Sequence, residues 1–192
     1  MTSSNPIASS ACVGAGVGPT NIKNVLGIVK AYTTRVGEGP FPTELSDETG
    51  EQMRKIGREF GTVTGRSRRC GWIDMVMLNY AIRLSGINQF ALMKLDVLDQ
   101  METIKICTHY LCDGEVVEAF PTSLKKLAQC QPVYEEMPGW MTDTSKATSF
   151  EELPVQAQNY INRIEQLTGV AVTIVAVGPK RSETIIRADL FA

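Results

Sequence analysis

The segment Phe90-Ala91-Leu92-Met93-Lys94-Leu95-Asp96 indicates the fold class of this chain. Its first four residues form a short, continuous apolar run, which is typical of a buried strand. Open α/β sheets place their ligands at the carboxyl ends of such strands. The stretch therefore predicts an α/β protein with Lys94 and Asp96 at a ligand-binding edge of its sheet.

Helices and further strands are predicted on both sides of this strand. Apolar residues recur at helical spacing from Asp74 to Gly86 and from Pro154 to Gly169, and each glycine ends its helix. The other predicted elements are a flexible loop over residues 2–19, an amphipathic helix over residues 20–33, a short helix from Ser46 through Ile56, an antiparallel hairpin over residues 104–117, and an apolar strand over residues 170–175. This alternation indicates an α/β arrangement with some antiparallel strands.

The composition is that of an ordinary globular protein. The chain has 192 residues, of which 43% are hydrophobic and 21% charged, and its formal net charge is -2. Such a chain has no general attraction for nucleic acid or for a membrane surface. The 5 cysteines form no C-x-x-C pair, which argues against a disulfide framework or a zinc site. We expect a cytoplasmic protein with no nucleic-acid partner, no membrane partner and no metal ligands in this chain.

The segment over residues 61–72 is the most informative candidate site. It places Arg66, Arg68 and Arg69 between glycines and ahead of a predicted helix. Guanidinium groups bind carboxylate or phosphate oxygens through two parallel hydrogen bonds, and two threonines in the segment add hydroxyl donors. The alternative is a solvated basic loop without a ligand. The flanking glycines and threonines favour the anion site.

Two shorter motifs are weaker when taken alone. The Asp96 carboxylate can accept hydrogen bonds from N1–H and the exocyclic amine of guanine, while the stem of Lys94 covers the base. Most K-x-D triplets, however, are surface charges. The junction at residues 176–180 offers backbone groups that are free to meet a ligand, but without further support it is only a turn.

Several common catalytic patterns are missing from the sequence. No G-x-x-x-x-G-K-[ST] loop is present, so the chain cannot hold a triphosphate by the usual means. The glycines at positions 14, 16 and 18 lack the preceding strand and the spaced acidic residue of a dinucleotide fingerprint. His109, the only histidine, is expected to pack or face solvent, and no Ser-His-Asp or Cys-His arrangement can be proposed.

Three segments, in this order and spacing, resemble adenylosuccinate synthetase. They are Val36-Gly37-Glu38-Gly39-Pro40-Phe41-Pro42-Thr43-Glu44-Leu45, residues 65–74, and Lys94-Leu95-Asp96. The G-x-G-P-F-P-T-E-L string is far more specific than the other motifs, and the similarity covers essentially all 192 residues. The resemblance implies that residues 1–192 are a C-terminal fragment of that enzyme. The fold would then be α/β, the C-terminal part of a P-loop-type mixed sheet flanked by helices, with an antiparallel hairpin.

The resemblance also implies a reaction. The family joins IMP to L-aspartate with GTP and Mg2+, and the products are adenylosuccinate, GDP and phosphate. The phosphate-binding loop, the catalytic residues and the Mg2+ ligands would lie in an N-terminal part that this chain lacks. The fragment alone is expected to be inactive, and the whole enzyme to be a cytoplasmic homodimer. One alternative is a non-catalytic guanine-nucleotide-binding module. RNA binding by the arginines is less favoured because interleaved aromatic residues are missing.

The site residues that the resemblance implies fall into three groups. Aspartate would be bound by Gly61, Thr62, Val63, Thr64, Gly65, Arg66, Ser67 and Arg68. IMP would be bound by Thr2, Val36 and Arg66, and GTP by Arg68, Lys94, Leu95, Asp96, Ala176, Val177 and Gly178. The family often has threonine at the position of Val63 and Ser-Thr-Gly at positions 176–178. Main-chain contacts would have to replace the missing hydroxyls.

Overall fold

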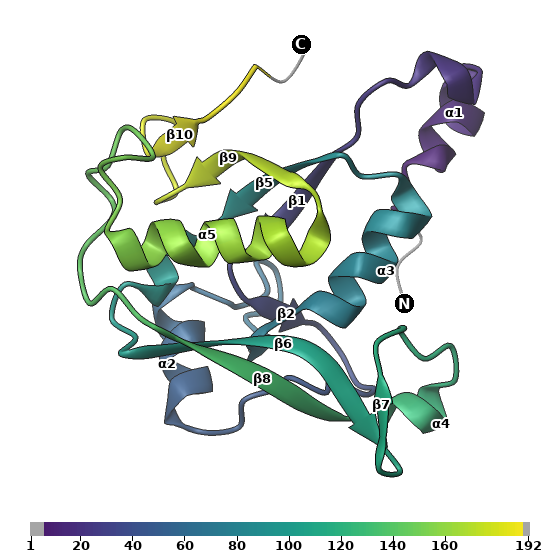
Figure 1. Ribbon diagram of the computed structural model, residues 1–192, viewed down its shortest axis with the longest axis horizontal. Coiled ribbons are helices and arrows are strands. Elements are labelled where there is room, and N and C mark those ends of the chain that lie inside the picture. Colours follow the sequence, from purple (N-terminus) through teal and green to yellow (C-terminus); the bar gives the residue numbers. More distant parts are fainter. Residues whose placement is uncertain (1–5, 190–192) are drawn as a thin grey trace.

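A computed structural model describes residues 6–189, which form two four-stranded sheets, a two-stranded ladder and the helices around them (Figure 1). The first sheet has the order β1 (Leu26–Lys30), β5 (Gln89–Met93), β9 (Ala171–Ala176) and β10 (Thr184–Ile186). The first three strands are parallel and β10 is antiparallel. The carboxyl ends of parallel strands lie at one edge of a sheet. Lys30, Lys94 and Ala176 therefore come to the same edge, and the predicted strand before Lys94 is confirmed.

The second sheet is built around β6 (Thr103–Cys112). It pairs in parallel with β4 (Ile73–Asp74) and antiparallel with β7 (Glu115–Val117) and β8 (Gln131–Pro138). Asp113 and Gly114 both have positive φ angles, as the predicted tight turn requires. β2 (Thr33–Arg35) and β3 (Arg69–Gly71) form the separate ladder. This ladder brings the loop that begins at Val36 next to the arginine segment.

The helices have the boundaries that their capping residues indicate. α2 (Glu48–Ile56) begins after Asp47, whose side chain accepts a hydrogen bond from Gly50 N at 3.0 Å. The longer α3 (Met75–Ser85) and α5 (Val155–Thr168) end at Gly86 and Gly169, which are left-handed. The remaining helices are α1 (Ser9–Ala15), α4 (Leu124–Leu127) and two 3-10 turns, Pro19–Asn21 and Leu95–Leu98.

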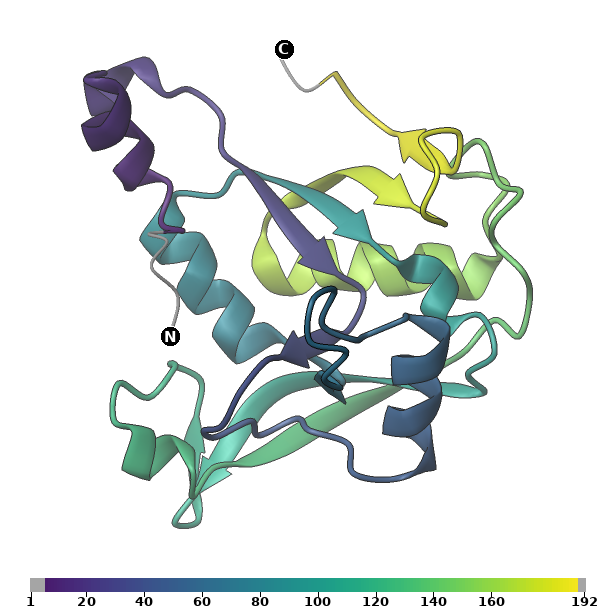
Figure 2. The ribbon, with the colours of Figure 1, turned by 180° about the vertical axis from the view of Figure 1, so that it is seen from behind.

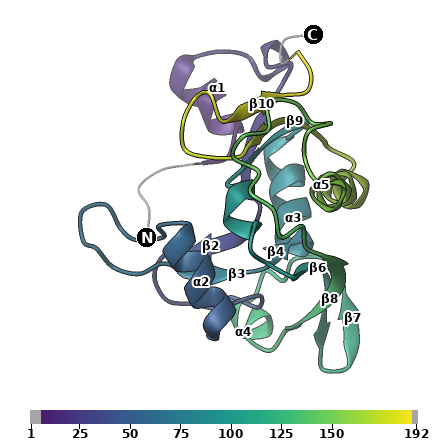
Figure 3. The same cartoon turned by 90° about the vertical axis from the view of Figure 1, so that its left-hand side faces the viewer.

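One face of the first sheet is covered by α5, with α3 beside it (Figures 1 and 3). The buried hydroxyl of Tyr160 in α5 donates to Ala31 O at 2.6 Å, just beyond the end of β1. α2 and the loop that follows it lie on the side of the molecule away from α5 (Figures 2 and 3). One apolar core joins both sheets and α5. No helix among residues 6–189 is long and apolar enough to cross a membrane.

Two predicted elements near the start of the chain are wrong. Residues 20–33 form β1 and a 3-10 turn instead of a helix, and residues 9–15 of the predicted flexible loop are helical. In β1 the position of Gly27 lies so close to Ile87 that a Cβ would stand 2.8 Å from its side chain. Strand pairing with β5 and this close approach outweigh the helical spacing of the apolar residues. α1 has no buried residue, so no apolar stripe could reveal it.

Candidate functional site

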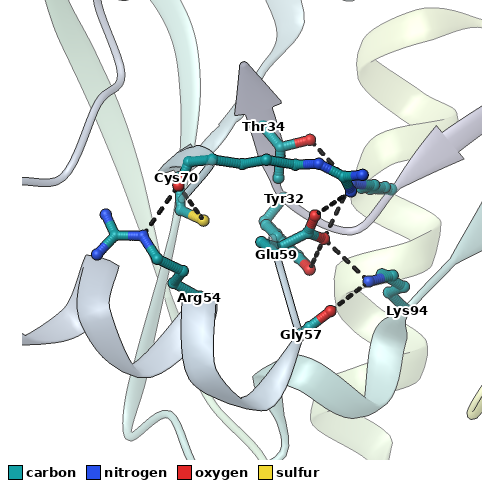
Figure 4. A network of polar contacts seen from close by, with 9 residues as sticks. Tyr32, Thr34, Arg54, Gly57, Glu59, Cys70 and Lys94 are labelled. Carbon is teal, nitrogen blue, oxygen red and sulfur yellow. Dashed lines mark hydrogen bonds and ion pairs between the residues drawn. The ribbon is translucent and has the colours of Figure 1, made fainter. Parts of the chain in front are cut away.

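The site is centred on a carboxylate that the sequence did not single out, that of Glu59 in the loop after α2. The Glu59 side chain is fully buried, and both lysines at the sheet edge reach its Oε1 (Figure 4). Lys30 Nζ and Lys94 Nζ each lie 2.9 Å from Oε1, and the Tyr32 hydroxyl donates to the same oxygen at 2.5 Å. The Arg68 guanidinium donates to Oε2 at 2.8 Å. Segments far apart in the sequence thus meet at one side chain.

Glu59 is charged despite its burial. Burial raises the pKa of a carboxyl, but hydrogen bonds from Tyr32, Lys30, Lys94 and Arg68 outweigh that effect and lower the pKa of Glu59 to about 2. The three cations retain side-chain exposures of 28%, 35% and 31%, whereas the carboxylate has 0%. One anion faces three cations that solvent can reach. The cluster therefore has an excess of positive charge that favours an anionic ligand.

The three arginines of the predicted anion site do not act together. Arg69 pairs with Glu44 and donates to the carbonyls of Gly37 and Gly39 at 3.2 and 2.8 Å. These contacts join the loop over residues 37–44 to the arginine segment. Arg68 is engaged by Glu59. Arg66 is exposed, and its guanidinium has no hydrogen-bond partner among the described residues.

The loop over residues 61–68 is closed by its own backbone. Gly61 N donates to Arg66 O, and Gly65 N donates to Gly61 O, both at 2.8 Å. Gly65 has a φ of 65°, which allows this tight turn. Most side chains of the loop are exposed, and Val63 is 96% exposed. The predicted aspartate-binding side chains thus project from a defined turn, although Arg68 points back to Glu59.

Asp96 lies in the 3-10 turn directly after Lys94. Its Oδ1 is buried and has no hydrogen-bond partner in the part of the chain that the structure describes, and burial raises the pKa of this carboxyl. Asp96 lines a cavity of about 330 Å³ together with Ile56, Asp99, Gln100, Met141, Thr142, Asp143 and Ser145. An unpaired buried acceptor costs about 1–3 kcal/mol, and a donor that reached the half-buried Asp96 carboxyl from the cavity would offset this cost.

Asp99 fixes the far wall of this cavity, another contribution that the sequence did not reveal. Its Oδ1 accepts from Trp140 Nε1 at 2.7 Å and its Oδ2 from Thr144 N at 2.8 Å. These bonds hold the segment over residues 140–144, which follows β8. The sequence could not reveal this role of Asp99, because its partners lie 41 and 45 residues away.

The other predicted positions differ in their accessibility. Val36 is exposed at the end of β2, whereas the side chain of Leu95 is fully buried and can offer only its backbone. Ala176 and Val177 are also buried. The amide of Val177 donates to Glu183 O at 2.9 Å, so the prediction that the backbone groups here are free is wrong for this amide. Thr2 lies outside the described residues.

The two sides of the site meet through Glu59. Arg68, from the arginine loop, and Lys94, from the sheet edge, share its carboxylate. The cavity beside Asp96 is lined by none of the three arginines. The arginine loop and the strand end are thus neighbours because both contact this buried carboxylate.

These features define an α/β protein whose candidate ligand site lies at the carboxyl edge of parallel strands. The site combines excess positive charge with a buried carboxylate oxygen that has no partner among the described residues. The sequence profile of the family described as adenylosuccinate synthetase matches residues 1–185. The chain belongs to the adenylosuccinate synthetase family.

Named relatives agree with this assignment. The chain is 61% identical over 191 residues to adenylosuccinate synthetase of Desulfitobacterium hafniense and 59% identical to that of Heliobacterium modesticaldum. The match covers 100% of this chain and 45% of each relative, so the chain spans less than half of their length.

Solved structures agree on the fold. The structure described as fully ligated adenylosuccinate synthetase from Plasmodium falciparum superposes with a TM-score of 0.94 at 38% identity, covering 98% of this chain and 45% of that one. The succinoaminodeoxyadenylate synthetase of cyanophage S-2L has a TM-score of 0.51 at 17% identity, a likeness of fold alone.

Proposed function

We propose that this chain forms the aspartate-binding and guanine-binding side of an adenylosuccinate synthetase. The whole enzyme would be a purine-biosynthesis ligase that joins IMP and L-aspartate and converts GTP to GDP and phosphate. Family membership supports this, as do the exposed arginine loop and the unpaired Asp96 oxygen. From the motif resemblance we further propose that the chain is the C-terminal part of a cytoplasmic, homodimeric enzyme. Light scattering of the full-length protein would test the dimer.

On the aspartate side, the loop over residues 61–68 would hold the amino acid by its carboxylates. Arg66 has an exposed guanidinium, which can bind a carboxylate through two parallel hydrogen bonds. Thr62 and Thr64 would add hydroxyl donors, and main-chain groups would serve at Val63. Arg66 would also approach the IMP ribose, with Val36 and Thr2 as the other proposed IMP contacts. Holding both carboxylates would leave the amine free to attack the purine.

On the guanine side, Asp96 would accept hydrogen bonds from the base. Guanine presents N1–H and an exocyclic amine side by side, whereas adenine presents N1 as an acceptor. The buried Oδ1 of Asp96 has no hydrogen-bond partner among residues 6–189, and this single observation carries the guanine assignment. Lys94, Leu95 and the backbone at residues 176–178 would complete the contacts. Arg68 would reach toward the GTP phosphates from the other side.

Mg2+ is assigned to no residue of this chain. Residues 6–189 contain no group of three or more His, Cys, Asp or Glu that could hold a metal ion. From the family resemblance we propose that the Mg2+ ligands, like the phosphate-binding loop and the catalytic residues, belong to the remainder of the enzyme. Residues 1–192 alone should then show no turnover of IMP, aspartate and GTP, and measurable turnover would refute this part of the proposal.

Exchanging Asp96 for asparagine tests the guanine assignment. Asp96→Asn keeps the size of the side chain, but its amide would face the N–H donors of guanine. The preference for GTP over ATP, measured as the ratio of kcat/KM values in the full-length protein, should fall roughly 10- to 100-fold. Asp143→Asn is the matched control, because Asp143 lines the same cavity and already bonds Ser145 N. Unchanged discrimination in Asp96→Asn would remove the assignment.

A non-catalytic guanine-nucleotide-binding module is the second candidate. It is supported by the same Asp96 oxygen, and it requires neither aspartate nor IMP. Calorimetry of the full-length protein with GDP cannot separate the two functions, because both predict binding. Consumption of aspartate in the presence of IMP and GTP does separate them, since only the ligase would incorporate it.

A further inference from the structure

We propose that Glu59 is a positioning residue that holds the aspartate-binding and guanine-binding sides in register through one buried carboxylate. This inference rests on the proposed function and adds a residue that contacts neither substrate. Its basis is that the two oxygens of the carboxylate contact different sides of the site. Oε2 receives Arg68 of the aspartate loop, and Oε1 receives Lys94 of the guanine side.

The geometry leaves Glu59 as the group that directs the Arg68 side chain. The backbone of Arg68 is fixed on both sides, because its amide donates to Glu59 O and its carbonyl accepts from Arg54 Nε, both at 2.9 Å. With the backbone held, the pairing at 2.8 Å between Arg68 NH1 and Glu59 Oε2 sets where the guanidinium points. A small displacement of the carboxylate would therefore move a substrate-facing charge.

Lys94 is held in a comparable way. Its backbone is left-handed, with a φ of 62°, and its Nζ donates to Gly57 O at 2.5 Å as well as to Glu59 Oε1 at 2.9 Å. Gly57 and Glu59 belong to the same loop that leads into the arginine segment. The lysine that follows β5 is thus attached to the segment that leads into the aspartate loop, and the Glu59 carboxylate links the two sides.

The charge balance indicates more than a stabilising ion pair. Lys30, Arg68 and Lys94 surround one carboxylate, and buried ion pairs contribute little net stability because desolvation opposes the attraction. The cations are partly exposed and Glu59 is not. A substrate anion can therefore approach the cations while the carboxylate stays in place. Such an arrangement fits a positioning role, in which the buried acid orients cations toward ligands.

The test measures both sides of the site in the full-length protein. Glu59→Gln removes the charge while keeping the shape, so Arg68 and Lys94 lose their common anchor. We expect the KM for aspartate and the KM for GTP each to rise roughly tenfold or more. Glu59→Asp keeps the charge but shortens the side chain, and both KM values should lie between those of wild type and Glu59→Gln.

Two further variants separate positioning from general damage. Glu135→Gln removes a carboxylate from a remote ion pair, Glu135 with Arg163, and should leave both KM values unchanged. Lys94→Met combined with Glu59→Gln should raise the KM for GTP by less than the product of the single effects, because both changes break one contact.

Three results would overturn the inference. The first is a rise in only one KM, and the second is a lowered melting temperature with both KM values unchanged. The third is a KM for GTP in the Lys94→Met, Glu59→Gln double variant that rises by the full product of the two single effects. If Glu59→Gln does not fold, Glu59→Asp takes its place, and a rise confined to one substrate again overturns the inference. The wild-type protein serves as the check on the proposed function. No aspartate-dependent turnover in wild type would remove that function, whereas wild-type turnover with indifferent Glu59 variants would remove only the positioning role.

Discussion

A buried carboxylate is stable as an anion only when donors replace the water that it has lost. Glu59 meets this condition with two lysines, an arginine and the hydroxyl of Tyr32. The contact with Glu59 has the opposite effect on the pKa of Tyr32. Burial, together with the bond to the Glu59 anion, raises the pKa of Tyr32 far above its ordinary value, so the phenol keeps the proton that it donates. At the scale of single residues, hydrogen bonds within the chain keep Glu59 deprotonated and Tyr32 protonated.

Acid unfolding should reveal the charge of Glu59. Its pKa is about 2 in the folded protein and 4.5 for an unperturbed glutamate. A carboxyl with a lowered folded pKa contributes stability that is fully present above the unfolded pKa and is lost as the pH falls toward the folded one. The contribution is at most about 3 kcal/mol. In denaturant titrations between pH 5 and pH 2, Glu59→Gln should therefore lose stability less steeply than wild type. Parallel curves would contradict this account.

At the scale of elements, locally encoded boundaries could be predicted from the sequence and strand pairings could not. α3 and α5 were predicted because their apolar stripes and terminal glycines act within a few residues. β8 was missed because Pro132 and Pro138 interrupt the strand pattern. Both are tolerated because β8 pairs with β6 alone and forms an edge of the sheet.

The residues of the candidate site also differ in whether a local motif reveals them. Arg66 and Asp96 lie in recognisable motifs, so the sequence could single them out. Glu59 lies between Arg58 and Phe60 in a loop without any motif, and two of its cation partners are 29 and 35 residues away. Only the pairing of distant segments creates its environment. The same holds for Asp99, whose role depends on the segment after β8.

The start of α3 offers a test at this scale. Asp74 is buried; its Oδ1 accepts from Met77 N at 3.1 Å and its Oδ2 from the Tyr110 hydroxyl at 2.5 Å, so it joins the helix cap to β6. Burial raises the pKa of Asp74, so the charged form is less favoured here than in an exposed aspartate. Asp74→Ala should reduce the free energy of unfolding by roughly 2–4 kcal/mol, through the lost cap and the unsatisfied hydroxyl.

Asp74→Asn should cost less, since its amide oxygen can still cap the helix. Tyr110→Phe is the control that removes the hydroxyl and leaves the cap. Thermal or denaturant unfolding of the three variants would rank them by their loss in free energy of unfolding. Equal losses in Asp74→Asn and Asp74→Ala would show that the carboxylate charge, and not the cap, is the stabilising feature.

At the scale of the whole molecule, the outer side of β1 is unusually open. Within residues 6–189, β1 pairs with β5 and with no other strand, yet it belongs to a parallel arrangement, and parallel sheets are normally covered on both faces. Ile28 is 69% exposed, and neighbouring apolar residues line an adjacent cavity that includes Leu78 and Ala81. α1 is exposed along its length, with Val13 at 87%. Because the chain spans 45% of its curated relatives, we expect this side to face the remainder of the longer protein.

Ile28→Asp tests that expectation. In residues 1–192 alone the side chain is largely in solvent, so the substitution should change the free energy of unfolding by no more than about 0.5 kcal/mol. In the full-length protein an aspartate at a covered position would be buried without a partner, which should cost roughly 2 kcal/mol or more and lower the melting temperature. Ile28→Val, which stays apolar, is the matched control and should be mild in both. Equally small effects of Ile28→Asp in the two proteins would mean that β1 remains an open edge in the complete enzyme.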